Sequence, residues 1–125
     1  MLKVDEHAVP HAVFTYPQIG GVGLTEAEAI KNHKILVGIG KYSDTAKGYA
    51  MAEEDGFVKV IVDAENYKIL GAHIIGPEAS ILVQQIVYLM NAGEQDYFPL
   101  GRAQTIHPAL SEVIIDAFGN LAPRH

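Results

Sequence analysis

The sequence of 125 residues contains no cysteine. This absence excludes structural disulfides, zinc–thiolate centres, nucleophilic thiols and redox-active cysteine pairs within the chain. If the protein takes part in thiol chemistry, the thiols must therefore belong to another polypeptide segment.

Basic residues are also few, with nine Lys and Arg against 15 Asp and Glu and a formal net charge of −6. No basic stripe is available to neutralise phosphates, so we expect neither nucleic acid nor an anionic membrane as a partner. No apolar run approaches the ~20 residues of a membrane-spanning helix, and no basic flank precedes an apolar signal stretch. These absences predict a cytoplasmic protein.

Hydrophobic residues make up 49% of the sequence, which is enough for the core of one ordinary domain. Residues 1–10 show no useful periodicity, so we expect them to form a linker or disordered arm. Residues 11–125 should form the domain itself.

Runs of β-branched and aromatic residues alternate with helical patterns along the domain. A capping-box spacing, Thr25 to Glu28, begins a short helix, and Pro108 precedes a final helix. We leave residues 43–55 unassigned and expect a loop over 17–24. The pattern predicts an α+β fold, an antiparallel sheet with helices packed on one face. The expected strands cover 11–16, 35–41, 56–62 and 67–75, with the last two forming a hairpin.

The longest predicted helix begins around residues 76–78 and ends at Asn91. Its polar positions Ser80, Gln84 and Asn91 fall on one narrow line, so apolar side chains cover most of its circumference. One side should pack on the sheet. The other side needs either another helix of this chain or another subunit, which indicates oligomerisation.

His107 and Glu112 are the main candidates for chemistry, because Glu112 should lie in the first turns of the final helix. A carboxylate there can fold back to the imidazole, fix its tautomer and favour its protonated form, as an acid–base group requires. The alternative is a histidine that only caps the helix or lies on the surface. The His107–Pro108 bond also admits the cis form.

Other candidates are weaker. His73 fits a half-exposed strand histidine better than a ligand, and Pro10 argues against a helix that would align His7 with His11 for a metal. Residues 38–40 lack the third glycine of a dinucleotide fingerprint. The acidic run 53–55 fits a solvated turn, and Tyr42, Tyr49 and Tyr67 fit strand or interface positions. We therefore predict no metal site.

Three motifs, in order, resemble one known family. Residues 13–26, Val-Phe-Thr-Tyr-Pro-Gln-Ile-Gly-Gly-Val-Gly-Leu-Thr-Glu, resemble the opening of the C-terminal dimerisation domain of pyridine nucleotide-disulfide oxidoreductases. Residues 56–76 resemble its central hairpin. Residues 107–112, His-Pro-Ala-Leu-Ser-Glu, resemble its H-P-T-x-x-E signature. The resemblance covers about residues 11–119, and Gly71 to Pro77 is most similar to dihydrolipoamide dehydrogenases rather than glutathione or mercuric reductases.

The resemblance implies a homodimer in which His107 reaches the partner subunit's active site, beside the flavin and a cysteine pair, as an acid and base. Glu112 would hold its other ring nitrogen, and Pro108 would lie near the partner's flavin. FAD and NAD(P) would be bound by the FAD and NAD(P) domains of the full-length enzyme and not by this segment alone, which has no G-x-G-x-x-G motif. A 2-oxo acid dehydrogenase complex is a further implied partner.

The sequence departs from the family pattern at two positions. Ala109 replaces the usual threonine and removes a hydroxyl able to cap the helix, at a cost of ~1 kcal/mol. Tyr49 stands where many members have arginine. The alternative to an enzyme segment is a stand-alone dimerisation or binding module without catalytic activity.

Overall fold

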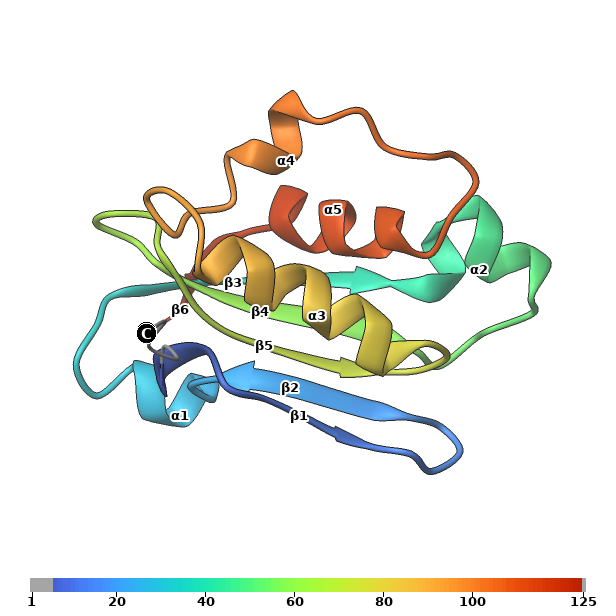
Figure 1. Cartoon of the computed structure of the whole chain (residues 1–125), viewed down its shortest axis with the longest axis horizontal. Coiled ribbons are helices and arrows are strands. Elements are labelled where there is room, and N and C mark those ends of the chain that lie inside the picture. Colours follow the sequence, from blue (N-terminus) through green and yellow to red (C-terminus); the bar gives the residue numbers. More distant parts are fainter. Residues whose placement is uncertain (1–5, 125) are drawn as a thin grey trace, which may run out of the picture.

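The computed structural model describes residues 6–124. Within them a six-stranded antiparallel sheet has the order β1-β2-β5-β4-β3-β6, and α3 and α5 cover one of its faces (Figure 1). The strands are β1 (Pro10–Val13), β2 (Ile19–Gly23), β3 (Ile35–Lys41), β4 (Phe57–Asp63), β5 (Ile69–Ile75) and β6 (Ala122–Arg124). The helices are η1 (Glu6–Ala8), α1 (Glu26–Ala29), η2 (Tyr42–Asp44), α2 (Ala46–Ala50), α3 (Ala79–Met90), α4 (Pro99–Arg102) and α5 (Ser111–Gly119).

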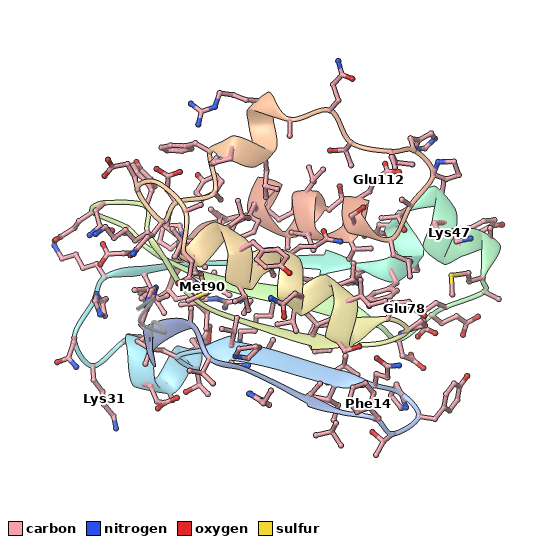
Figure 2. All side chains as sticks on the ribbon, viewed as in Figure 1. Phe14, Lys31, Lys47, Glu78, Met90 and Glu112 are labelled. Carbon is pink, nitrogen blue, oxygen red and sulfur yellow. The ribbon has the colours of Figure 1, made fainter. Side chains whose placement is uncertain are left out.

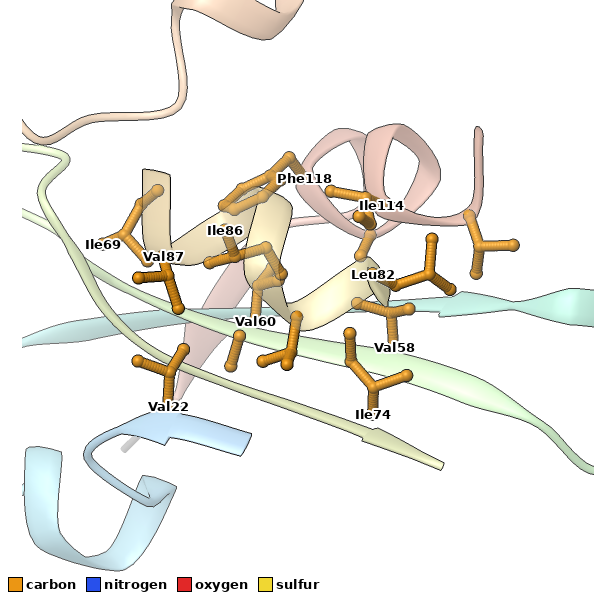
Figure 3. Packing of buried hydrophobic residues seen from close by; sticks show 14 of the residues in the cluster. Val22, Val58, Val60, Ile69, Ile74, Leu82, Ile86, Val87, Ile114 and Phe118 are labelled. Carbon is orange, nitrogen blue, oxygen red and sulfur yellow. The ribbon is translucent and has the colours of Figure 1, made fainter. Parts of the chain in front are cut away.

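The main core lies between this sheet and the two long helices. Alternate residues of β4, Val58, Val60 and Val62, are fully buried, because side chains of a strand point to opposite faces in turn. Figure 3 shows Val58 and Val60 packed with Ile86 of α3 and Ile114 of α5, and Val62 belongs to the same cluster. Each such side chain contributes ~1.5–3 kcal/mol on burial. The predicted α+β class and the antiparallel hairpin of β4 and β5 are confirmed.

Two glycines in β3 allow α5 to approach the sheet. A Cβ at Gly38 would meet the carbonyl group of Ala117, and a Cβ at Gly40 would meet the backbone of Val113 and Ala117. Glycine in a strand interior often marks such a close approach of another backbone. Gly38 and Gly40 therefore allow the helix to pack closely on the sheet. Both lie within β3 and not in a loop, as expected when the sequence was judged to lack a dinucleotide-binding motif.

The short helix α1 covers part of the opposite face. Ala29 packs there with Ile35, Val37 and Ile61 in a second, smaller buried cluster. Its predicted capping box is confirmed: Thr25 Oγ1 accepts the Glu28 N–H at 3.2 Å, and the Thr25 N–H donates to Glu28 Oε1 at 3.0 Å.

Two strands were missed from the sequence. The expected loop over 17–24 contains β2, and β6 follows α5 and pairs with β3. The sequence analysis expected a loop here because Pro17 and the Gly20-Gly21 pair usually end a strand, but both glycines lie inside β2. A Cβ at Gly20 would meet the Ala79 carbonyl oxygen at 2.8 Å, so this glycine also allows close packing, in this case of α3.

The expected arm is also partly structured. Glu6–Ala8 forms η1, Ala8 is buried in the main core, and β1 begins at Pro10. The described part of the expected arm, residues 6–10, thus contains regular secondary structure. Residues 1–5 of the expected arm lie outside the described residues.

The unassigned segment 43–55 contains η2 and α2, and Tyr42 holds it in place. The Tyr42 ring is fully buried against Gly56 and Gly76, and its hydroxyl donates to the Pro77 carbonyl oxygen at 2.7 Å. Burial raises the pKa of Tyr42 above its usual value, and nearby Glu53 and Glu78 add to this. Tyr42 is thus a core residue, not the strand or interface residue expected.

Pro77 precedes α3 rather than lying in its first turn, and Glu78 at φ 62° is the N-cap.

We predict that Tyr42→Phe lowers the free energy of unfolding by about 1 kcal/mol, because the ring still packs but the Pro77 carbonyl loses its donor. Urea unfolding at neutral pH measures the change. Tyr49→Phe is the matched control, since Tyr49 is exposed and should show no loss. Equal stability of the two variants would contradict the role of the buried hydroxyl.

Candidate functional site

The segment between α3 and α5 forms an arch that carries α4 and stands away from the sheet (Figure 1). At its first end, the Tyr97 ring stacks on Phe118 of α5, with ring centroids 5.1 Å apart, and the Ile69 N–H donates to the Gln95 carbonyl. Residues 101–108 are all exposed. His107 lies near the other end of this arch, just before α5.

The structure brings His107 and Glu112 together. His107 Nδ1 and Glu112 Oε1 are 2.8 Å apart, and Figure 2 shows Glu112 at the start of α5. An ionised carboxylate can only accept a hydrogen bond, so Nδ1 carries the proton and Nε2 keeps a lone pair. The His107 side chain is 69% exposed and that of Glu112 26% exposed. Among residues 6–124, Nε2 has no hydrogen-bond partner, so its lone pair faces outward.

Glu112 has a second bond that fixes its carboxylate. Oε1 also accepts the Ala109 N–H at 3.1 Å. Positions 109 and 112 thus have capping-box spacing, but Ala109 has no hydroxyl with which to complete the box, unlike Thr25 in α1. A carboxylate in the first turn of a helix is further stabilised by the helix dipole. Alanine at position 109 therefore lacks one hydrogen bond of a capping box, but Glu112 is still held by its bonds to His107 and Ala109.

Asp116, one turn further along α5, was missed by the sequence analysis. Burial, the negative charge of Glu112 and that of Asp44 in η2 together raise the pKa of the Asp116 carboxyl. The only available signal was the i, i+4 spacing from Glu112, which places both carboxylates on one helix face. The His107–Glu112 pair thus borders an acidic surface.

The remaining candidates lie elsewhere. Pro108 is exposed beside His107, and the peptide bond between them is cis. His73 is half-buried in β5, as expected, and its Nε2 bonds to the Leu24 carbonyl oxygen at 3.0 Å. His7 lies in η1 and His11 in β1, so they share no helix.

Residues 6–124 contain neither a cluster of metal-ligating side chains nor a membrane-spanning helix. No group of three or more His, Cys, Asp or Glu side chains is placed to hold a metal ion. None of the helices in this part of the chain has the length and apolar character needed to cross a membrane.

The outer side of α3 and the arch expose large apolar side chains. Ile81 and Tyr88 of α3 are 57% and 67% exposed, and Ile106 of the arch is 79% exposed. A hollow of about 300 Å³ lies between α3, the arch and α5, with Leu89, Ile106 and Ile114 among its lining residues. The predicted uncovered side of this helix is therefore present, and no segment among the described residues covers it.

The chain thus combines an antiparallel sheet, backed on one face by α3 and α5, with a His–Glu pair at the start of α5. Residues 9–118 match the family described as the pyridine nucleotide-disulphide oxidoreductase dimerisation domain. The chain belongs to this family, whose members are FAD- and NAD(P)-dependent disulfide oxidoreductases. The predicted membership is confirmed.

Individual relatives are similar over most of the chain. A mycothione reductase of Mycobacterium tuberculosis is 44% identical over 119 residues, which are 94% of this chain and 26% of the relative. A dihydrolipoyl dehydrogenase of Haloarcula marismortui is 40% identical over 119 residues, 94% of this chain and 24% of the relative. The chain therefore spans about a quarter of the length of these relatives.

Solved structures share the fold. The HOCl-induced flavoprotein disulfide reductase RclA from Escherichia coli superposes with a TM-score of 0.82 at 28% identity, over 90% of this chain and 26% of that one. LpdA from Mycobacterium tuberculosis also gives a TM-score of 0.82, at 22% identity, over 91% and 25% of the two chains.

We predict that Asp116→Asn stabilises the domain at pH 7 but not at pH 3. A carboxyl whose pKa is raised in the folded state favours folding in its protonated form, so its contribution falls as the pH rises from below 3.8 through the raised pKa. Unfolding midpoints in urea at both pH values measure this. Asp55→Asn, at an exposed turn, is the control and should show no such difference. An equal gain from Asp116→Asn at both pH values would contradict the charge argument.

Proposed function

We propose that this chain is the dimerisation domain of a flavin-dependent disulfide oxidoreductase and that His107 and Glu112 supply an acid–base pair to the partner subunit's active site. One observation carries the proposal: Glu112 holds His107 through Nδ1 and leaves Nε2 free and exposed at the end of the arch. A base that serves a separate subunit needs such an outward lone pair. The family membership supports the assignment.

The chemistry proposed for His107 is proton transfer in dithiol–disulfide exchange. Nε2 accepts the proton of a thiol, and the resulting thiolate attacks one sulfur of a disulfide. The second sulfur leaves as a thiolate and takes the proton back from Nε2. Throughout, the Glu112 carboxylate stabilises the imidazolium and keeps the ring in one tautomer. The chain has no cysteine, so both sulfur centres come from outside it.

The flavin and the nicotinamide nucleotide do not fit the residues of this chain. The glycines that resemble part of a phosphate-binding loop, Gly38 and Gly40, lie in β3 and are covered by the backbone of α5. We therefore assign the binding of both cofactors to other parts of the parent enzyme and derive no step through them. Pro108 remains proposed as a neighbour of the partner's flavin.

A homodimer is the proposed assembly. Exposed apolar side chains of this size on one face of a helix are typical of a surface that a partner covers. The arch with His107 lies on the same side of the sheet as α3 (Figure 1), so a second copy seated on Ile81, Tyr88 and Ile106 would come close to the histidine. Dimerisation and the site would then depend on the same surface.

The proposed substrate is a dihydrolipoyl-type dithiol, and a 2-oxo acid dehydrogenase complex is the corresponding partner. The relatives named dihydrolipoyl dehydrogenase support this choice. The 44% identity with a mycothione reductase favours mycothione as the second candidate. The alternative of a module without catalytic activity is less favoured, since the His107–Glu112 pair is intact.

In the parent enzyme, His107→Ala should slow dithiol–disulfide exchange by ~10²–10⁴-fold, because it removes the acid–base group. Glu112→Gln should cause a smaller loss, since an amide can still contact the ring but carries no charge. Flavin absorbance should be unchanged in both. His33→Gln, remote from the arch, is the control. A His107→Ala enzyme of full activity would exclude the proposed role.

The 125-residue chain should sediment as a dimer, and Tyr88→Glu should convert it to a monomer by placing a charge in the apolar contact. Ile39→Glu is the matched control, because Ile39 is also exposed, at 38%, but points to the opposite face of the sheet from its neighbours Gly38 and Gly40, which lie against α5. It should remain dimeric. If Tyr88→Glu leaves the dimer intact and Ile39→Glu disrupts it, the interface lies on the other face.

A further inference from the structure

Three neighbouring strands bring two histidines to opposite sides of one glycine. In the sheet register, His11 of β1 faces Gly21 of β2, and Gly21 faces His73 of β5. Gly20 points toward α3, so the row that contains Gly21 lies on the opposite face of the sheet, away from the proposed dimer surface.

Both imidazoles lean over Gly21. A Cβ at Gly21 would lie 2.7 Å from His11 Nε2 and 3.2 Å from His73 Nδ1. The Cε1–Nε2 edge of His11 and the Nδ1 atom of His73 therefore border the same small space above this residue. Glycine leaves that space open, and any side chain there would separate the two rings.

The hydrogen bond made by one ring nitrogen of His73 leaves the other ring nitrogen unprotonated. The Leu24 carbonyl oxygen can only accept, so His73 Nε2 carries the proton and Nδ1 keeps its lone pair. A histidine that binds a metal commonly donates its second N–H to a backbone carbonyl in this way. Within residues 6–124, the His11 ring makes no hydrogen bond or ion pair, so its Nε2 is also available.

The charges around the two rings are compatible with a cation. Glu28 in the first turn of α1 interacts electrostatically with His73. Lys59, the neighbour of His73 on β4, has its Nζ 3.6 Å from Glu26 Oε2, which offsets its positive charge.

We propose that His11 Nε2 and His73 Nδ1 together bind a divalent transition-metal ion such as Zn²⁺ above Gly21. Zn–N bonds are ~2.0–2.1 Å long, so one ion bound in the space above Gly21 would have both nitrogens as ligands. Because no third protein ligand converges there within the described residues, water completes the coordination. Imidazole ligands favour Zn²⁺ over Mg²⁺, which takes oxygen ligands. The ion would connect the edge strand β1 to β5 across β2.

Calorimetric titration of the 125-residue chain with ZnCl₂ tests the proposal. We expect one Zn²⁺ per chain and no binding of Mg²⁺. His11→Gln and His73→Gln should each weaken Zn²⁺ binding by ~10-fold or more, as a disturbed ligand set does. The glutamine at 73 can still donate to Leu24. His107→Gln is the control, because His107 also has a free Nε2, and it should bind Zn²⁺ as the unchanged chain does.

Zn²⁺-soaked crystals of the unchanged chain provide a second test that needs no variant. The anomalous peak should lie between His11 and His73. The proposal is overturned if the chain binds no Zn²⁺, if the loss of either histidine leaves the Zn²⁺ affinity unchanged, or if the peak lies only at another site.

Discussion

The close approach of α5 to β3 is the contact on which the rest of the structure depends. Gly38 and Gly40 present no side chain, so the backbone of α5 at Val113 and Ala117 lies directly on the sheet. This contact fixes the position of the helix start, and the helix start carries Glu112. The same helix supplies Phe118, on which the arch is anchored through Tyr97. The placement of His107 thus follows from two missing side chains in a strand.

Elements with a strong local pattern could be predicted from the sequence. β3 was placed with its observed bounds, and the hairpin and α3 differ from expectation by only a few residues at their ends. β2 and β6 were missed for a physical reason. Gly20, Gly21 and Pro123 are usual signs of a break, but in β2 the neighbouring helix requires glycine, and β6 is a short edge strand, where proline is tolerated.

For the candidate site too, contacts between residues close in sequence could be predicted, and contacts between distant residues could not. The His107–Glu112 contact is local, five residues apart, and the helix pattern was enough to anticipate it. The influence of Asp44 on Asp116 and the meeting of His11 with His73 join residues that are distant in sequence. Contacts of this kind depend on strand register and on the packing of separate elements, and neither can be obtained from spacing in one sequence.

The carboxylate oxygen that Glu112 shares between two hydrogen bonds affects how the proposed site could lose function. One atom, Glu112 Oε1, accepts hydrogen bonds from both the His107 ring and the Ala109 N–H just before α5. The orientation of the imidazole therefore depends on the first turn of α5 being folded. A change far from His107 that lets the first turn of α5 unwind would release the ring as well. Under the proposed function, such a change would have the kinetic effect of losing the acid–base group, although His107 and Glu112 would both still be present.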